Sequence, residues 1–141
     1  MSGSIVPCPS CQAKNRLRPE ASATEVPRCG RCASSLPWLV EATDQTFGHE
    51  VKAPMLVLVD LWAPWCGPCR QVAPVLADLS RELAGRLKVV KVNVDQNPQL
   101  AARFQARSIP MLLVMQDSEV KETLLGARPK GALRQSLAPY L

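Results

Sequence analysis

Hydrophobic residues follow a regular pattern from about residue 38 to the C-terminus. Short apolar runs of strand length alternate with segments in which apolar residues recur at helical spacing. This pattern predicts strands at 38–41, 55–61, 88–94, 111–116 and 120–125, and helices opening at 43 or 44 and spanning 66–83, 97–104 and 129–138. The last two strands are separated only by a turn at Asp117 and Ser118. The sequence therefore predicts an α/β fold with a mixed sheet, parallel at first and antiparallel at one edge, covered by helices on both faces.

The longest predicted helix carries a clear apolar stripe. The residues that would face the sheet are Val72, Val75, Leu76, Leu79 and Leu83. Pro74 lies within this stripe and removes one backbone hydrogen bond. We therefore expect a kinked helix packed on the sheet.

Residues 1–37 have a different composition. They are rich in Pro, Ser, Arg and Cys, contain no Phe, Trp or Tyr, and show no amphipathic period. Such a segment cannot build a core unaided and needs a metal ion or disulfides. The chain is therefore expected to consist of an N-terminal module at 1–37 and a larger domain at 38–141, with the boundary near Ser34 to Pro37.

Four cysteines in the N-terminal module have the spacing of a metal site. Cys8 and Cys11 form one pair, and Cys29 and Cys32 form the other, in the pattern C-x2-C-x17-C-x2-C. This spacing is typical of zinc ribbons, and a site of four thiolates has no open position, so one structural Zn²⁺ ion is expected. A second redox centre or two disulfides are the alternatives.

A second type of cysteine pair lies in the larger domain. Cys66 and Cys69 stand between the predicted central strand and the long helix, after Trp65 and around Gly67 and Pro68. The free N–H groups and the dipole at a helix N-terminus favour an anion, so the Cys66 thiol should ionise more readily than a free cysteine. Cys66 would then be the exposed nucleophile, and Cys69, one turn on, the shielded resolving thiol. A structural disulfide or half of a metal site is the alternative interpretation.

Asp60 is a carboxylate within the otherwise apolar central strand. An aspartate is almost never fully buried without a purpose, and burial would raise its pKa toward neutrality. It could then transfer a proton near neutral pH. The alternative is a strand-end residue that faces solvent.

The net charge of +5 does not indicate a nucleic-acid partner. Residues 1–37 hold five basic and two acidic residues, a net charge of +3, which four thiolates and one Zn²⁺ ion would reduce to +1. The basic residues are not interleaved with aromatic ones, as base stacking would require. The sequence also has no stretch of about 18 apolar residues and no apolar secretory core, so no membrane association is expected and the cytoplasm is the expected location.

The residues around the second cysteine pair resemble the thioredoxin family closely. The similarity extends over about residues 38–141 and includes Asp60, Trp62, Ala63, Trp65, the Cys-Gly-Pro-Cys sequence, the segment Val89–Pro98, the segment Ser108-Ile109-Pro110 and Gly126-Ala127. Thioredoxins of one bacterial type also carry an N-terminal extension with four zinc-ligating cysteines, which the front of this chain resembles. Ser118, Met111 and Leu61 depart from the family's usual residues.

The resemblance implies roles for particular residues. It assigns Asp60 as the buried base that deprotonates Cys69, Lys91 as the lysine near this carboxylate, and Pro110 as a cis-proline beside the cysteine pair. A solvated strand residue is the alternative for Lys91. The residues that would contact a substrate protein are Trp65, Gly67, Pro68, Ile109 and Gly126.

The resemblance also implies an activity and partners. The chain is expected to reduce protein disulfides in client proteins and to be reduced in turn by an NADPH-dependent flavoprotein reductase. An oxidase or isomerase on the same fold is one rival, although such relatives usually carry a histidine before the second cysteine. A zinc-ribbon adaptor that uses the fold only to hold partners is the other rival.

Overall fold

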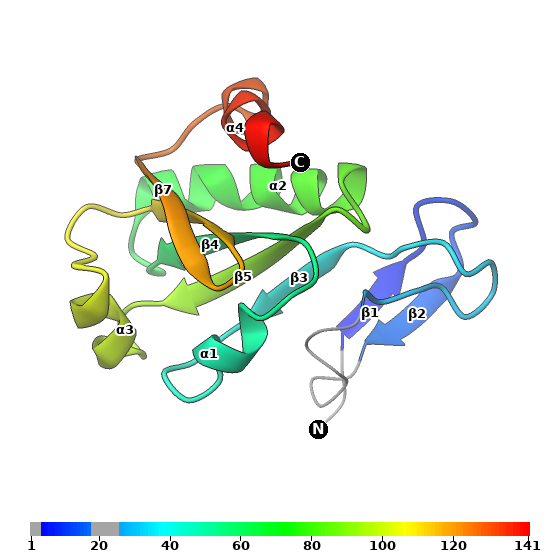
Figure 1. The fold of residues 1–141 in the computed structure, drawn as a ribbon, viewed down its shortest axis with the longest axis horizontal. Coiled ribbons are helices and arrows are strands. Elements are labelled where there is room, and N and C mark those ends of the chain that lie inside the picture. The colour runs from blue at the N-terminus through cyan, green and yellow to red at the C-terminus, as the bar shows by residue number, and fades with distance from the viewer. Residues whose placement is uncertain (1–3, 18–25) are drawn as a thin grey trace.

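The computed structural model describes residues 4–17 and 26–141 (Figure 1). Its elements, in chain order, are β1 (Ser4–Pro7), β2 (Lys14–Leu17), β3 (Trp38–Glu41), α1 (Phe47–Glu50), β4 (Leu56–Trp62), α2 (Gly67–Glu82), β5 (Leu87–Asn93), α3 (Pro98–Arg103), β6 (Met111–Gln116), β7 (Glu119–Leu125), α4 (Lys130–Leu137) and a 3₁₀ turn at Ala138–Tyr140. Every strand and helix predicted after residue 37 is present. The bounds of the strands agree with the predicted ranges to within one residue.

Five strands form the predicted mixed sheet, in the order β3-β5-β4-β6-β7. Strands β3, β5 and β4 are parallel, whereas β6 and β7 are antiparallel to their neighbours. Helices α2 and α4 cover one face of the sheet, and α1 and α3 cover the other (Figure 1). None of the helices in the described ranges is long and apolar enough to cross a bilayer.

The central strand β4 divides its side chains between the two faces. Leu56 and Leu58 belong to the core beneath α2 and α4, whereas Val57 and Val59 belong to the core beneath α1 and α3. Because side chains alternate along a strand, Asp60 lies on the face that α2 covers. This places the carboxylate beneath the helix that begins at the cysteine pair.

Helix α1 begins later than the sequence predicts. Its N-cap is Thr46, and not Thr43 or Asp44. The Asp44 carboxylate instead accepts hydrogen bonds from the backbone N–H groups of Gln99 (3.3 Å) and Leu100 (2.9 Å) in the first turn of α3. Asp44 therefore is a helix-capping residue, as its type suggests, but it caps a helix that is distant in sequence.

The N-terminal module contains a small antiparallel hairpin of β1 and β2. Its core consists of cysteines and the fully buried Leu36. Next to Leu36, Ser35 approaches the turn after α2, where a Cβ on Gly85 would lie 2.6 Å from the Ser35 Oγ. Gly85 also has a φ of +85°, so a glycine there permits both the turn and the close approach of the module. The predicted module at 1–37 includes residues outside the described ranges, and its boundary remains a prediction.

Candidate active site and metal centre

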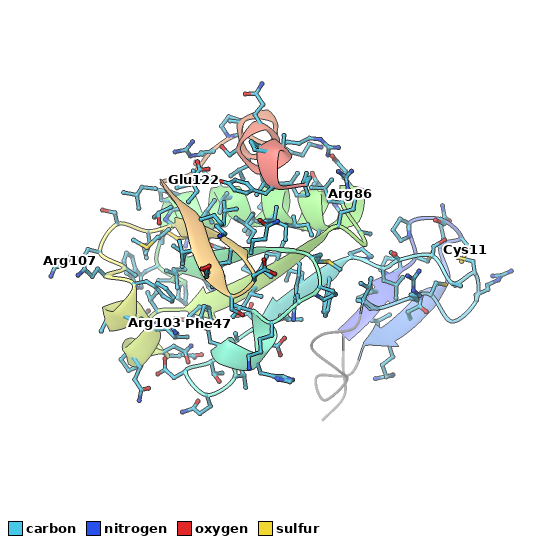
Figure 2. All side chains as sticks on the ribbon, viewed as in Figure 1. Cys11, Phe47, Arg86, Arg103, Arg107 and Glu122 are labelled. Carbon is cyan, nitrogen blue, oxygen red and sulfur yellow. A yellow bond between two sulfur atoms is a disulfide. The ribbon has the colours of Figure 1, made fainter. Side chains whose placement is uncertain are left out.

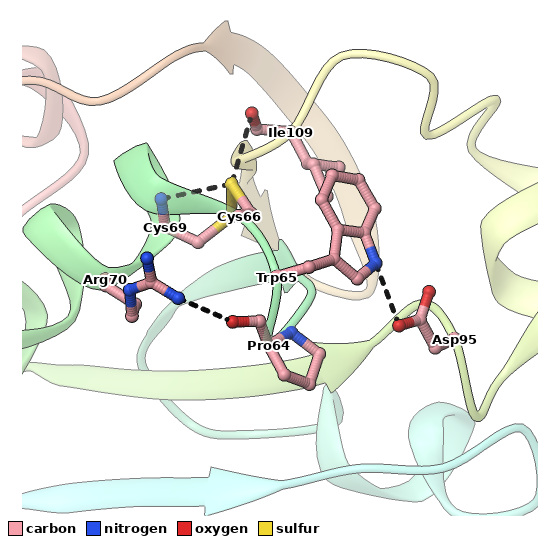
Figure 3. Close-up of a disulfide and its surroundings, with 7 residues drawn as sticks. All are labelled: Pro64, Trp65, Cys66, Cys69, Arg70, Asp95 and Ile109. Carbon is pink, nitrogen blue, oxygen red and sulfur yellow. Dashed lines mark hydrogen bonds between the residues drawn. A yellow bond between two sulfur atoms is a disulfide. The ribbon is translucent and has the colours of Figure 1, made fainter.

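A disulfide joins Cys66 and Cys69 where β4 leads into α2 (Figure 3). Cys66 is the N-cap of α2, with extended backbone angles, and Pro68 lies in the first turn of the helix. The backbone N–H of Cys69 donates to the Cys66 Sγ at 3.1 Å. In the reduced protein this N–H and the helix dipole would stabilise a thiolate on Cys66.

The two cysteines are equally buried in this disulfide form. Cys66 is 4% exposed and Cys69 is 3% exposed, so the predicted difference in exposure is absent. The disulfide holds both sulfur atoms in a small cluster with the buried Ala63, against which Trp62 and Ile109 pack. The two cysteines differ instead in position, because only Cys66 is the N-cap and only its Sγ accepts the helix N–H.

The loop before β6 forms the wall beside the disulfide. The Ile109–Pro110 bond is cis, as the resemblance implied. The Ile109 carbonyl oxygen lies 3.7 Å from the Cys66 Sγ (Figure 3), and a reduced Cys66 thiol could donate a hydrogen bond to it. The Pro110 carbonyl accepts a hydrogen bond from the N–H of Gly126 at 2.9 Å, so the end of β7 is fixed beside the same loop.

Trp65 presents an apolar surface next to the disulfide. Its side chain is 66% exposed, and its Nε1 donates to the Asp95 Oδ2 at 3.0 Å (Figure 3). A Cβ on Gly67 would meet no atom within 4 Å, so the surface beside Trp65 is open. Arg70 reaches back from α2 to donate to the Pro64 carbonyl at 3.0 Å, which fixes the loop that carries Trp65.

Asp60 is buried, as predicted, and is only 1% exposed. Neither carboxylate oxygen has a hydrogen-bond partner among the described residues. Burial raises the pKa of Asp60 to about 7, an effect that the charge of Lys91 opposes and the charge of Glu41 reinforces. The interpretation of Asp60 as a solvent-facing residue at the end of a strand is therefore wrong.

Lys91 lies on β5, directly across from Asp60 on β4. Its Nζ lies 5.0 Å from the centre of the Trp62 ring, a distance typical of a cation–π contact. Trp62 follows Asp60 by two residues and therefore shares its face of the sheet. The structure thus brings Lys91 close to the carboxylate, as the resemblance implied.

The four cysteines of the N-terminal module converge on one point. Their sulfur atoms all lie within 4.8 Å of one another. The Cys8 and Cys32 sulfur atoms are 3.5 Å apart, and those of Cys11 and Cys29 are 3.6 Å apart. A tetrahedral zinc site with Zn–S bonds of about 2.3 Å has sulfur atoms about 3.8 Å apart, so these residues fit a tetrathiolate metal site.

The first cysteine of each pair accepts hydrogen bonds from the turn that follows it. Cys8 Sγ accepts from the N–H groups of Ser10 (3.4 Å) and Cys11 (3.5 Å), and Cys29 Sγ accepts from the Arg31 N–H at 3.4 Å. These donors suit sulfur atoms that carry negative charge. The thiols are not joined as disulfides, so the arrangement favours a metal site over that alternative.

Two residues near the sites were not predicted from the sequence. Asn15 connects the two halves of the cysteine cluster: its Nδ2 donates to the Cys29 Sγ at 3.5 Å, and its Oδ1 accepts from the Gly30 N–H at 2.9 Å. Asp95 orients the Trp65 indole, as described above. Neither residue belongs to a recognisable motif, and their contacts depend on chain segments that are distant in sequence.

Comparisons with known proteins agree with this geometry. The family model described as Thioredoxin matches residues 38–139. The thioredoxin of Bacillus subtilis is 48% identical over 103 residues, which are 73% of this chain and 98% of that protein. Thioredoxin 1 of a Nostoc species is 47% identical over 102 residues, which are 72% of this chain and 95% of that protein.

The matched region contains the disulfide, the cis-proline loop and the buried aspartate. The four-cysteine cluster lies before it. The chain belongs to the thioredoxin family of thiol–disulfide oxidoreductases.

Proposed function

We propose that this chain is a protein-disulfide reductase. The observation that supports this function best is the disulfide at the N-terminus of α2, with the Ile109 carbonyl 3.7 Å from the Cys66 Sγ. An extended substrate segment could lie along the backbone of Ile109, beside the sulfur atom that reacts. Trp65, Gly67, Pro68 and Gly126 would form the surface that accepts this segment.

In the proposed reaction the reduced protein supplies two electrons. The Cys66 thiolate attacks one sulfur atom of the substrate disulfide, forms a mixed disulfide and releases the first substrate thiolate. The Cys69 thiolate then attacks the Cys66 Sγ and releases the second substrate thiolate. The product is the Cys66–Cys69 disulfide seen in the structure, and the substrate is left as a dithiol.

Asp60 is proposed to accept the proton of Cys69 in the second step. Its pKa of about 7 suits proton transfer near neutral pH. Lys91 would modulate this pKa from the neighbouring strand, and Pro110 would hold the substrate loop in place. These roles are proposals that rest on the positions of the residues.

The proposed partners are disulfide-containing client proteins and an NADPH-dependent flavoprotein reductase that restores the dithiol.

The part of the chain that the structure describes contains four free thiols, which are those of Cys8, Cys11, Cys29 and Cys32, and such a set suits a reducing compartment. The cytoplasm is therefore the proposed location.

Two measurements distinguish this proposal from its rivals. A reductase should catalyse the reduction of insulin disulfides by dithiothreitol, whereas an adaptor should not. The reduction potential of the Cys66–Cys69 pair should lie near −270 mV, the approximate value for thioredoxin, and a value near −120 mV would indicate an oxidant. An inactive protein, or one with the oxidising potential, would contradict the proposal.

We propose further that the cysteine cluster holds one structural Zn²⁺ ion per chain. Metal binding should supply most of the folding free energy of the module, on the order of 10 kcal/mol, because its core is so small. Removal of zinc by a chelator should therefore unfold the module and leave the sheet domain folded, since the two large apolar clusters contain no residue of the module.

Elemental analysis of the reduced protein and an NMR spectrum before and after chelation check this prediction. The Cys8→Ser/Cys32→Ser variant should lose zinc, and the Cys66→Ser/Cys69→Ser variant should keep it. Less than about half an equivalent of zinc in the reduced wild-type protein would count against the site.

A further inference from the structure

Three charged residues lie side by side on three neighbouring strands. Glu41 on β3 is paired in register with Lys91 on β5, and Lys91 is paired in register with Asp60 on β4. Residues that are aligned across adjacent strands place their side chains on the same face of a sheet. The order Glu41, Lys91, Asp60 therefore extends from the exposed edge of the sheet to its buried centre.

Lys91 lies between the two carboxylates without pairing closely with either. Among the ion pairs within 4 Å that the described residues form, none joins Lys91 to Asp60 or to Glu41. The Lys91 ammonium instead lies over the Trp62 ring. A cation in this position is available to both acids.

The same region contains buried polar atoms that lack partners. Both carboxylate oxygens of Asp60 and the Nε1 of Trp62 are buried and make no hydrogen bond within the described residues. Glu41 lies exposed at the edge of the sheet, but partial desolvation raises the pKa of its carboxyl, an effect that the charge of Lys91 opposes. Glu41 is thus linked to the Asp60 site through Lys91.

We propose that Glu41 is a positioning residue for the resolving step. From the edge strand, Glu41 shares the Lys91 ammonium with Asp60 and so prevents Lys91 from forming a close ion pair with the buried carboxylate. This role rests on the proposed function, in which Asp60 takes the proton of Cys69. Glu41 itself touches neither the substrate nor the reacting sulfur atoms. It acts on them through Lys91 and Asp60.

The charges around Asp60 determine the direction of the effect. Lys91 and Glu41 are the charged groups that act on Asp60, and the first lowers its pKa whereas the second raises it. On α2, which covers the same face, Cys69 is held in the disulfide and carries no titratable thiol, and on β6 the apolar Leu112 is paired in register with Asp60. Removal of the Glu41 charge would take away a repulsion and would also allow Lys91 to move toward Asp60. Both changes favour the ionised form of Asp60.

The decisive experiment is an NMR titration of the Asp60 carboxyl carbon in the Glu41→Gln variant. The midpoint should fall by about half a pH unit, the size expected for one charge at the edge of a protein. Glu119→Gln on β7 is the matched control, because it removes the same charge from an exposed site on the other edge strand. Glu41→Asp, which keeps the charge, should restore most of the wild-type midpoint.

A second comparison separates positioning from a simple long-range charge effect. In a Lys91→Met background, Glu41→Gln should shift the Asp60 midpoint less than it does in the wild type, because no cation remains to be shared. An unchanged Asp60 midpoint in Glu41→Gln, or the same shift in both backgrounds, would overturn the proposal. The titration needs no substrate, so either result is independent of whether the protein reduces client disulfides.

Discussion

Cys66→Ser is expected to abolish disulfide reduction, whereas Cys69→Ser should still attack a substrate and then remain attached to it. The Cys66 Sγ lies at the helix N-terminus, where the Cys69 N–H can stabilise a thiolate, and beside the Ile109 carbonyl. Without Cys66 no attack takes place. Without Cys69 the mixed disulfide has no internal thiol to resolve it, so it accumulates.

The trapped species is measured by non-reducing gel electrophoresis and mass spectrometry of the variants mixed with a disulfide-containing protein. A product that dithiothreitol releases is expected with Cys69→Ser only. The double variant Cys66→Ser/Cys69→Ser is the control and should capture nothing. Capture by Cys66→Ser and not by Cys69→Ser would reverse the two roles.

Asp60→Asn is expected to stabilise the oxidised protein at pH 8 by up to about 4 kcal/mol. The pKa of Asp60 is about 7 in the folded protein and about 3.8 in the unfolded chain. Between these values the folded state binds a proton that the unfolded state has lost, so stability decreases as the pH rises from about 4 to 7. Above pH 7 the folded protein carries the full cost of a buried charge, and asparagine removes that cost.

Denaturant unfolding at a series of pH values checks this result. The gain should be small near pH 4 and reach its maximum above pH 7. Asp117→Asn, in the exposed turn before β7, is the matched control and should show no such pH dependence. Parallel stability profiles for Asp60→Asn and the wild type would show that the Asp60 pKa is not raised. The same variant should resolve mixed disulfides more slowly near neutral pH, which stopped-flow kinetics can follow.

Much of the fold could be predicted because local patterns and the tertiary structure agree. The apolar run of β4 indicates a strand that is buried on both faces, and the stripe on α2 specifies one buried face. The turn at Asp117 and Ser118 joins two strands whose apolar pattern is clear. The start of α1 could not be predicted in this way. Asp44 has the side chain of an N-cap, but which helix it caps depends on where α3 packs.

The candidate site likewise has features that local sequence patterns predict and features that depend on tertiary packing. The Cys66–Cys69 pair and the cysteine cluster were recognised from spacing, and the burial of Asp60 was predicted from its apolar neighbours. The relation between Glu41 and Lys91 requires the register of two parallel strands, which are far apart in sequence. The contact of Asn15 with Cys29 likewise depends on the fold of the module. Sequence reasoning therefore found the reactive groups and missed the residues that orient them.

The Cys66–Cys69 disulfide and the four-cysteine cluster lie at opposite ends of the molecule. Figure 2 shows Cys11 at one end and Arg107, two residues before Ile109, at the other. The module contacts the turn that leads into β5, whereas Cys66 follows the far end of the parallel strand β4, whose seven residues span about 23 Å. A disulfide requires Cα atoms within about 7 Å, so no cysteine of the cluster can pair with Cys66 in the same folded molecule. Any thiol exchange between the two sites must therefore be a second-order reaction between molecules, and dilution would slow it without affecting the chemistry within either site.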